Sequence, residues 1–257
     1  MPAFFEHPIS IQGNVFFASD FHFGVPDEER SQQRENAIVQ WLDQIQNSAQ
    51  HLFLLGDIFD FWFEYRDVIP KGFCHFFAKL REFRQKGIQI YYFTGNHDMW
   101  VKDYFSKYLG IKIFRSQQAF IINGKRCVIG HGDGLDPTDK GYLLIKKIFA
   151  SRINIALYGA LPPRWAFALA RACSRKSRNS NSEKKLPEIG NQKIIEYISA
   201  FLHKEQADCF IYGHTHLPTE VEVATGTIYY NTGDWLTHQS YLSWTEEGIK
   251  LFCPSSH

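Results

Sequence analysis

Cysteine is scarce in this sequence and never occurs in close pairs. The five cysteines are scattered, and none of them forms a Cys-x-x-Cys motif. This pattern argues against a disulfide framework and against a cysteine-ligated zinc site. It fits a reduced, cytoplasmic setting.

Long apolar runs and a large net charge are also missing. No stretch of about 18 uncharged apolar residues occurs, so no membrane-spanning helix is expected. The first residues have neither a basic start nor a long apolar run, so we expect no signal peptide. The formal net charge of +1 provides no global attraction to nucleic acid, and no nucleic-acid partner is expected.

The sequence does contain enough apolar material for one large core. Apolar residues make up 44% and aromatic residues 16% of the 257 positions, which indicates a globular rather than a disordered chain. The length corresponds to one sizeable domain, or to one domain with an insertion. It gives no indication of an oligomeric state.

Five apolar segments end in the same way, with polar residues directly after the last apolar one. The turns that follow them are Asp20-Phe21-His22, Gly56-Asp57-Ile58-Phe59-Asp60, Gly95-Asn96-His97-Asp98, Gly130-His131-Gly132-Asp133 and Gly213-His214-Thr215-His216. Sites in α/β folds lie beyond the carboxyl ends of the strands. We therefore expect the five turns to form one site.

The order of the expected elements defines the fold class. Strands at 14–19, 52–55 and 88–93 alternate with helices at 31–48 and 73–83, which predicts parallel strands joined by helical crossovers. A short helix at 101–109, an Asn-Gly hairpin at 120–129 and the short strands after residue 207 follow. The prediction is an α/β fold in which two packed sheets, a β-sandwich, are flanked by helices.

Residues 137–190 differ from the rest of the chain. They have a helical pattern and concentrate basic residues among apolar ones, including Lys140, Lys146, Lys147, Arg152, Arg164 and Arg171. We predict a core of residues 1–136 and 191–257 and a helical, basic and apolar lid insertion of residues 137–190, in which the polar stretch 174–185 is mobile. The alternative is an ordinary helical hairpin with a solvated basic face.

The residue types at the five turns suit a pair of metal ions. Carboxylate, amide and imidazole groups without thiolate suit Mn²⁺, Fe or Zn²⁺. The candidate ligand groups are too many for one ion and about the right number for two ions that share Asp57. The candidate ligands are Asp20, His22, Asp57, Asn96, His131, His214 and His216. Two cations roughly 3.5–4 Å apart support phosphoryl transfer. The alternative for any single residue is a turn or cap role.

The ordered motifs resemble those of the calcineurin-like metallophosphoesterase superfamily, whose fold is a two-layered β-sandwich with a dinuclear metal centre. The resemblance implies that one metal ion takes Asp20, His22, Asp57 and His216, and the other takes Asp57, Asn96, His131 and His214. It also implies catalytic roles for His97, facing the substrate, and for Asp98, orienting His97. Asp60 and Asp133 are expected to brace the site rather than to bind metal.

Within that superfamily the layout is similar to the UDP-2,3-diacylglucosamine diphosphatase family of lipid A synthesis. The similarity rests on the aromatic residues after Asp57, on Asp139 and Tyr142 after the fourth turn, and on the basic insertion. It implies cleavage of the substrate's pyrophosphate to UMP and 2,3-diacylglucosamine 1-phosphate by a water that two divalent ions, Mn²⁺ in that family, activate. The expected partners are this acylated nucleotide sugar and, peripherally, the cytoplasmic face of the inner membrane. The expected substrate contacts are Asn96, His97, Asp139, Tyr142, Lys146 and Lys147.

Two other functions remain open at this stage. One is a soluble metallophosphoesterase that acts on another phosphodiester or nucleotide, such as a cyclic nucleotide. The other is a metal-poor scaffold protein, which would have no reason to keep the whole ligand set. Many members of the diphosphatase family carry Arg where this chain has His97, the residue general to the superfamily.

Overall fold

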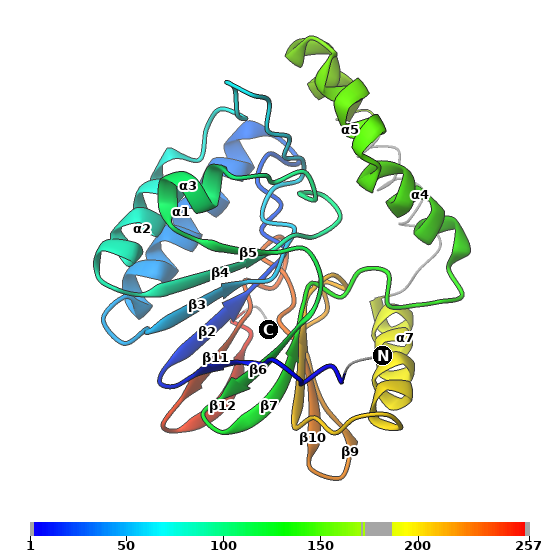
Figure 1. Ribbon diagram of the computed structural model, residues 1–257. Helices are drawn as coiled ribbons and strands as arrows, with labels where there is room; N and C mark the ends of the chain where they lie inside the picture. The colour runs from blue at the N-terminus through cyan, green and yellow to red at the C-terminus, as the bar shows by residue number, and fades with distance from the viewer. Residues whose placement is uncertain (1–2, 171, 173–186, 255–257) are drawn as a thin grey trace.

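The computed structural model describes residues 3–170, 172 and 187–254. Two sheets of six strands each face one another, with helices outside (Figure 1). The first sheet has the order β12 (Gly248–Phe252), β11 (Tyr241–Thr245), β2 (Val15–Ala18), β3 (His51–Leu54), β4 (Gln89–Phe93) and β5 (Lys112–Phe114). The second has the order β1 (Ile9–Ile11), β6 (Gln118–Ile122), β7 (Lys125–Ile129), β8 (Cys209–Tyr212), β10 (Thr227–Asn231) and β9 (Thr219–Ala224). The predicted fold class is confirmed.

Helices cover the outer face of each sheet. α1 (Glu28–Ile45), α2 (Cys74–Gln85) and α3 (Tyr104–Leu109) pack on the first sheet, and α7 (Pro187–Leu202) packs on the second (Figure 1). α1 begins where the Asp27 carboxylate accepts a hydrogen bond from the backbone N–H of Arg30 at 2.8 Å. Its apolar stripe, centred on Trp41 and Leu42, is buried.

The connections decide where the strand ends lie. β2, β3 and β4 are parallel neighbours joined by α1 and α2, and β7 and β8 are parallel neighbours in the other sheet. Parallel neighbours end at the same edge, so the turns after them meet. The Asn123-Gly124 turn between β6 and β7 has positive φ at both residues, as the sequence predicts. The prediction lacks β1 and β5 because a strand of three residues is too short to show an alternating pattern.

Stacked aromatic rings fill the space between the sheets. Phe53 of β3 lies 4.8 Å from Phe17 and 4.5 Å from Tyr91, and it meets Phe120 of the opposite sheet edge-on at 5.1 Å. All four rings are buried. Such pairs add roughly 0.5–1.5 kcal/mol each beyond the burial of their area. The strand ends that carry the five turns are therefore anchored in a well-packed core.

α4 (Lys140–Ala150), α5 (Arg152–Gly159) and the chain up to residue 170 form an arm beside the sandwich (Figure 1). The arm contacts the core through aromatic rings: Trp100 stacks on Tyr158 with an interplanar angle of 15° and donates a hydrogen bond to the Phe149 carbonyl at 3.0 Å. α7 starts before the predicted boundary at residue 190. The stretch 174–185, predicted to be mobile, lies outside the described residues. Among the described helices, none has both the length and the apolar content to cross a bilayer.

Candidate metal centre

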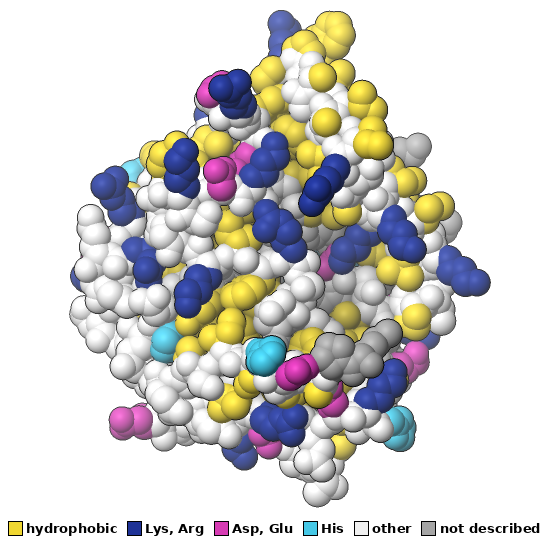
Figure 2. Space-filling view, in the orientation of Figure 1, with side chains coloured by type: hydrophobic (Ala, Val, Ile, Leu, Met, Phe, Trp, Pro, Cys, Tyr) yellow, Lys and Arg dark blue, Asp and Glu magenta, His cyan; other side chains and the backbone are white. Residues whose placement is uncertain are grey.

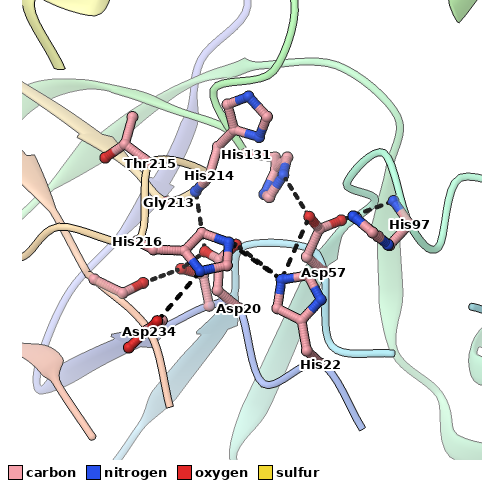
Figure 3. A network of polar contacts seen from close by, with 12 residues as sticks. Asp20, His22, Asp57, His97, His131, Gly213, His214, Thr215, His216 and Asp234 are labelled. Atoms are coloured by element: carbon pink, nitrogen blue, oxygen red, sulfur yellow. Dashed lines mark hydrogen bonds and ion pairs between the residues drawn. The ribbon is translucent and has the colours of Figure 1, made fainter. Parts of the chain in front are cut away.

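The five turns converge at one edge of the sandwich, and their side chains point toward one another (Figure 3). Five of the candidate ligands have a left-handed backbone: φ is 56° at Asp20, 46° at His22, 52° at Asp57, 71° at His214 and 63° at His216. This region costs energy for residues other than glycine and is concentrated at functional sites. The backbone is thus strained where the candidate ligands lie.

Glycine is required where two of these turns cross. Gly56 has a φ of 88°, and a Cβ atom on it would lie 2.7 Å from the backbone nitrogen of Gly95 and 2.7 Å from Nδ1 of His131. No side chain fits such a separation. The glycines of the motifs therefore allow the β3, β4 and β7 turns to approach one another.

Asp20, His22 and His216 form the first group of ligand atoms. Nε2 of His216 lies 3.2 Å from Oδ1 of Asp20 and 3.2 Å from Nε2 of His22. His22 and Asp20 are buried, and His216 is partly exposed. Two imidazole nitrogens and a carboxylate oxygen directed at one point are a donor set for a divalent cation.

Asp57, His131 and His214 form the second group, with ligand atoms within 4.8 Å of one another. Oδ2 of Asp57 lies 3.3 Å from Nε2 of His131 and 3.9 Å from Nε2 of His22 in the first group. One carboxylate thus lies between the two groups. This is the position that the sequence assigns to a residue shared by two ions.

Four buried polar atoms of the candidate ligands form no hydrogen bond with the described residues. One of them, Nδ1 of His22, lies 3.5 Å from a carboxylate oxygen of Asp60, and the other three are Oδ1 of Asp20, Oδ1 of Asn96 and Nε2 of His131. A buried polar atom without a partner costs about 1–3 kcal/mol. Each of the three belongs to a different turn, and each is a candidate ligand atom. Divalent cations would satisfy all three, so the residues present fit the metal ions that the motifs imply.

The pKa values of the histidines reflect this crowding of candidate ligands. Burial acts to lower the pKa of His131, but the Asp57 carboxylate outweighs it and raises the pKa to about 10. Burial opposes a raised pKa at His216 too, yet Asp20 and then Asp234 raise it to about 10. Burial and the neighbouring His131 lower the pKa of His214 to about 4. Imidazole binds a metal ion in its unprotonated form, so metal ions compete with protons for His131 and His216.

His97 lies at the rim of the site with its ring edge-on to His22, 4.8 Å between centroids. Its Nδ1 lies 2.8 Å from the carbonyl oxygen of Asp60, and its backbone N–H donates to Oδ1 of Asp57 at 2.9 Å. The carboxylate of Asp60 is 3.7 Å from the same Nδ1. Asp60 therefore orients His97.

Asp98 is buried and hydrogen-bonded to two turns of the site. Its two oxygens accept hydrogen bonds from the backbone N–H groups of Ile58 and Gly95 and from the hydroxyl of Tyr92, at 2.9, 2.7 and 2.5 Å. Asp98 thus ties the β3 and β4 turns together. The role of Asp98 in orienting His97, which the resemblance implies, stays a prediction.

Two of the arm's predicted substrate contacts, Tyr142 and Lys146, bind Asp133, whose carboxylate interacts with His131 and His214 of the second group. Tyr142 donates to the Asp133 carboxylate at 2.8 Å, and Lys146 pairs with the same carboxylate at 2.6 Å. Asp139 caps α4 by accepting from the backbone N–H of Tyr142 at 3.0 Å. Lys147 is exposed. The arm thus begins at the metal centre, with Asp133 as the connection.

The sequence analysis missed Asp234, which lies 3.2 Å from Nδ1 of His216. The signal was available: strand β10 is followed by Thr232-Gly233-Asp234, the same pattern of an apolar strand and polar turn as in the other five. The segment contains no histidine, and its Gly233-Asp234 pair repeats the Gly-Asp pair of Gly56-Asp57, so the repeat was the signal that the sequence analysis did not use.

These turns and this sandwich define a class of protein. The family model of the calcineurin-like phosphoesterases matches residues 13–218, and the chain belongs to that family. It is a metal-dependent phosphoesterase, and the scaffold hypothesis is set aside.

Similarity to individual proteins is more specific. A Porphyromonas gingivalis protein named UDP-2,3-diacylglucosamine hydrolase is 31% identical over 248 residues, which cover 91% of this chain and 95% of that protein. A Shewanella baltica protein of the same name is 28% identical over 237 residues, covering 92% and 95%. Among solved structures, an archaeal phosphodiesterase aligns with a TM-score of 0.46 at 13% identity, over 93% of this chain and 99% of that one.

Proposed function

We propose that this phosphoesterase hydrolyses the pyrophosphate of UDP-2,3-diacylglucosamine to UMP and 2,3-diacylglucosamine 1-phosphate. The observation that carries the proposal is the combination of a phosphoesterase metal centre with an apolar and basic arm that starts at its edge. A substrate with a pyrophosphate and two acyl chains needs both. The relatives named UDP-2,3-diacylglucosamine hydrolase support it.

The centre is proposed to hold two divalent ions, Mn²⁺ being the first choice. Asp20, His22, Asp57 and His216 would hold one ion, and Asp57, Asn96, His131 and His214 the other. When bound, such a pair lowers the pKa of a water molecule and offsets negative charge on phosphorus. Asp57 between the two groups, with Oδ2 within 3.9 Å of nitrogens from both, supports the shared position.

His97 is proposed to act on the substrate. Its Nδ1 is engaged by the Asp60 carbonyl, so Nε2 is the nitrogen left to face the substrate. From there it can stabilise negative charge on the pyrophosphate or deliver a proton to the leaving oxygen. Asp60 keeps the ring in the orientation that this role requires.

The arm is proposed to be a lid that binds acyl chains and rests on an anionic membrane surface. Apolar side chains are exposed along it, with Ile153 at 72% and Trp165 at 68%. Lys140, Arg152 and Arg164 are exposed on the same arm. Figure 2 shows apolar and basic side chains gathered on the upper part of the molecule, where the arm lies. Apolar insertion combined with basic contacts is how peripheral proteins bind anionic bilayers, here the cytoplasmic face of the inner membrane.

The test is the release of UMP from UDP-2,3-diacylglucosamine in mixed micelles with Mn²⁺. Asp57→Ala should abolish release, whereas Asp43→Ala, which changes a half-exposed aspartate paired with Lys79 on the helical layer, should not. Metal-dependent hydrolysis of a simple phosphodiester or a cyclic nucleotide without any UMP release would keep the phosphoesterase and rule out the lipid substrate.

A further inference from the structure

The last residue of β10, Asn231, and the residues that follow it up to Trp235 form a sixth turn of the site. The side-chain amide of Asn231 donates to the carbonyl of Gly213 at 2.6 Å, and the backbone N–H of Trp235 donates to the carbonyl of Asp20 at 3.2 Å. The hydroxyls of Thr232 and Ser19 are 2.7 Å apart. The segment thus contacts both turns that contribute to the first group of ligands.

Asp234 contacts the candidate ligand His216 through its side chain. It is buried, with 3% of its surface exposed. Oδ1 accepts from the backbone N–H groups of Thr237 and His238 at 3.1 and 3.0 Å and lies 3.1 Å from Nδ1 of His238. Oδ2 is left for Nδ1 of His216 at 3.2 Å. One oxygen fixes the carboxylate, and the other is directed at the imidazole (Figure 3).

The contact decides which nitrogen of His216 faces the centre. An imidazole that donates Nδ1–H to a carboxylate presents an unprotonated Nε2 to a metal ion. Nε2 of His216 is the atom within 3.2 Å of Asp20 and His22. The negative charge of Asp234 also increases the electron-donating power of the ring.

The second group of ligands uses a neutral partner for the same purpose. Nδ1 of His131 lies 2.7 Å from the backbone carbonyl of Leu55. A carbonyl fixes the tautomer but adds no full charge. The two halves of the centre therefore differ: a charged group supports His216, and a peptide group supports His131.

We infer that Asp234 is a positioning residue that sets the metal affinity of the Asp20, His22 and His216 half of the centre, with little effect on the other half. This inference rests on the two-ion centre of the proposed function. A purely structural role, in which Asp234 only closes its own turn, would affect both halves alike or neither.

The variant Asp234→Asn separates these roles. The amide keeps the shape but has one accepting oxygen, which cannot serve both His216 and the N–H groups of Thr237 and His238. Asp208→Asn is the matched control: Asp208 also accepts a backbone N–H, that of Arg126, but it lies before β8, at the far end from the site. Both variants are made in the full chain.

The measurement is a Mn²⁺ titration of metal-free protein, with the bound metal counted and its electron paramagnetic resonance spectrum recorded. Asp234→Asn should weaken one ion about 10- to 100-fold, the usual effect of removing such a partner. It should leave the other ion unchanged, so that the spectrum of an isolated Mn²⁺ ion persists where the wild type shows a coupled pair. Asp208→Asn should behave as the wild type.

Unchanged affinities in Asp234→Asn would overturn the inference, as would an equal loss at both sites together with a lowered melting temperature. A wild-type chain that binds a single Mn²⁺ ion would instead remove the two-ion centre on which the proposal depends. Substrate plays no part in the titration, so the wrong choice of phosphoester cannot produce any of these results.

Discussion

The sandwich and the arm differ in how far their functional side chains are exposed to solvent. In the sandwich the candidate ligands are mostly buried and their backbone is strained: Asp20 and Asp57 are almost fully buried and have a left-handed backbone. In the arm they are exposed: none of the residues of α4 and α5 is buried, and apolar side chains such as Ile153 and Leu157 face outward. Under the proposed function, the comparison separates the chemistry, in the sandwich, from the choice of substrate, in the arm. The candidate ligands belong to the buried region, and the apolar side chains of the arm are exposed.

The largest effect should come from Asp57→Ala. The carboxylate lies between the two groups of ligand atoms, so its loss should release both ions and reduce turnover by at least about 100-fold, the scale of a single charge-stabilising group. Metal content and kcat measured together provide the check. A variant that keeps both ions and most of its activity would show that Asp57 is not the shared ligand.

Phe53→Ala tests the rigid region away from the metal ions. The ring is fully buried among Phe17, Tyr91 and Phe120, and its removal should lower the free energy of unfolding by about 3–5 kcal/mol. Urea denaturation measures this change. Turnover per folded molecule should fall far less than in Asp57→Ala, and an equal fall would mean that the core is coupled to the chemistry.

The double variant Ile153→Ser and Leu157→Ser tests the arm. Both side chains are exposed, at 72% and 65%, so the free energy of unfolding should change by no more than about 0.5 kcal/mol. Binding to anionic vesicles should fall roughly 10-fold or more, because burial of such a side chain in an apolar phase is worth about 1.5–3 kcal/mol. Vesicle sedimentation measures the binding. A large loss of stability with unchanged binding would show that these residues belong to a packed interface.

The sequence predicts well those features of the site that depend on neighbouring residues in the chain. An apolar strand followed by Gly-Asp or Gly-His is a local pattern, and five of them in one chain predict both the sheets and the candidate ligands. The role of Asp98 and the contribution of Asp234 are not local, since each depends on which turns cross in space. Asp98 accepts a hydrogen bond from the backbone of Ile58, 40 residues earlier in the chain. Asp234 contacts His216, from which β9 and β10 separate it in the sequence. Only the folded chain shows such neighbours.

For the arm, the sequence leaves two alternatives open for a related reason. Its basic and apolar residues are visible in the sequence, but a helix of that composition can be a lid or a solvated hairpin. The aromatic contact of Trp100 with Tyr158, which fixes the arm on the sandwich, joins residues far apart in the chain. Neither residue has a spacing that would reveal the pairing.

The smallest predicted effect lies where the two regions meet. Tyr142→Phe removes the hydroxyl that donates to Asp133 and leaves Lys146 in place, so the base of the arm should loosen without losing its charge pair. A hydrogen bond of this kind contributes about 1 kcal/mol, which corresponds to about a fivefold lower kcat/KM with micellar substrate. Lys147→Ala is the comparison: the sequence predicts a substrate contact there too, but the side chain is exposed, so kcat/KM should change less than about twofold. If Lys147→Ala has the larger effect, the outer face of α4 binds substrate. In that case the arm would not act through its connection to the sandwich at Asp133, and the proposed separation of the two regions is wrong.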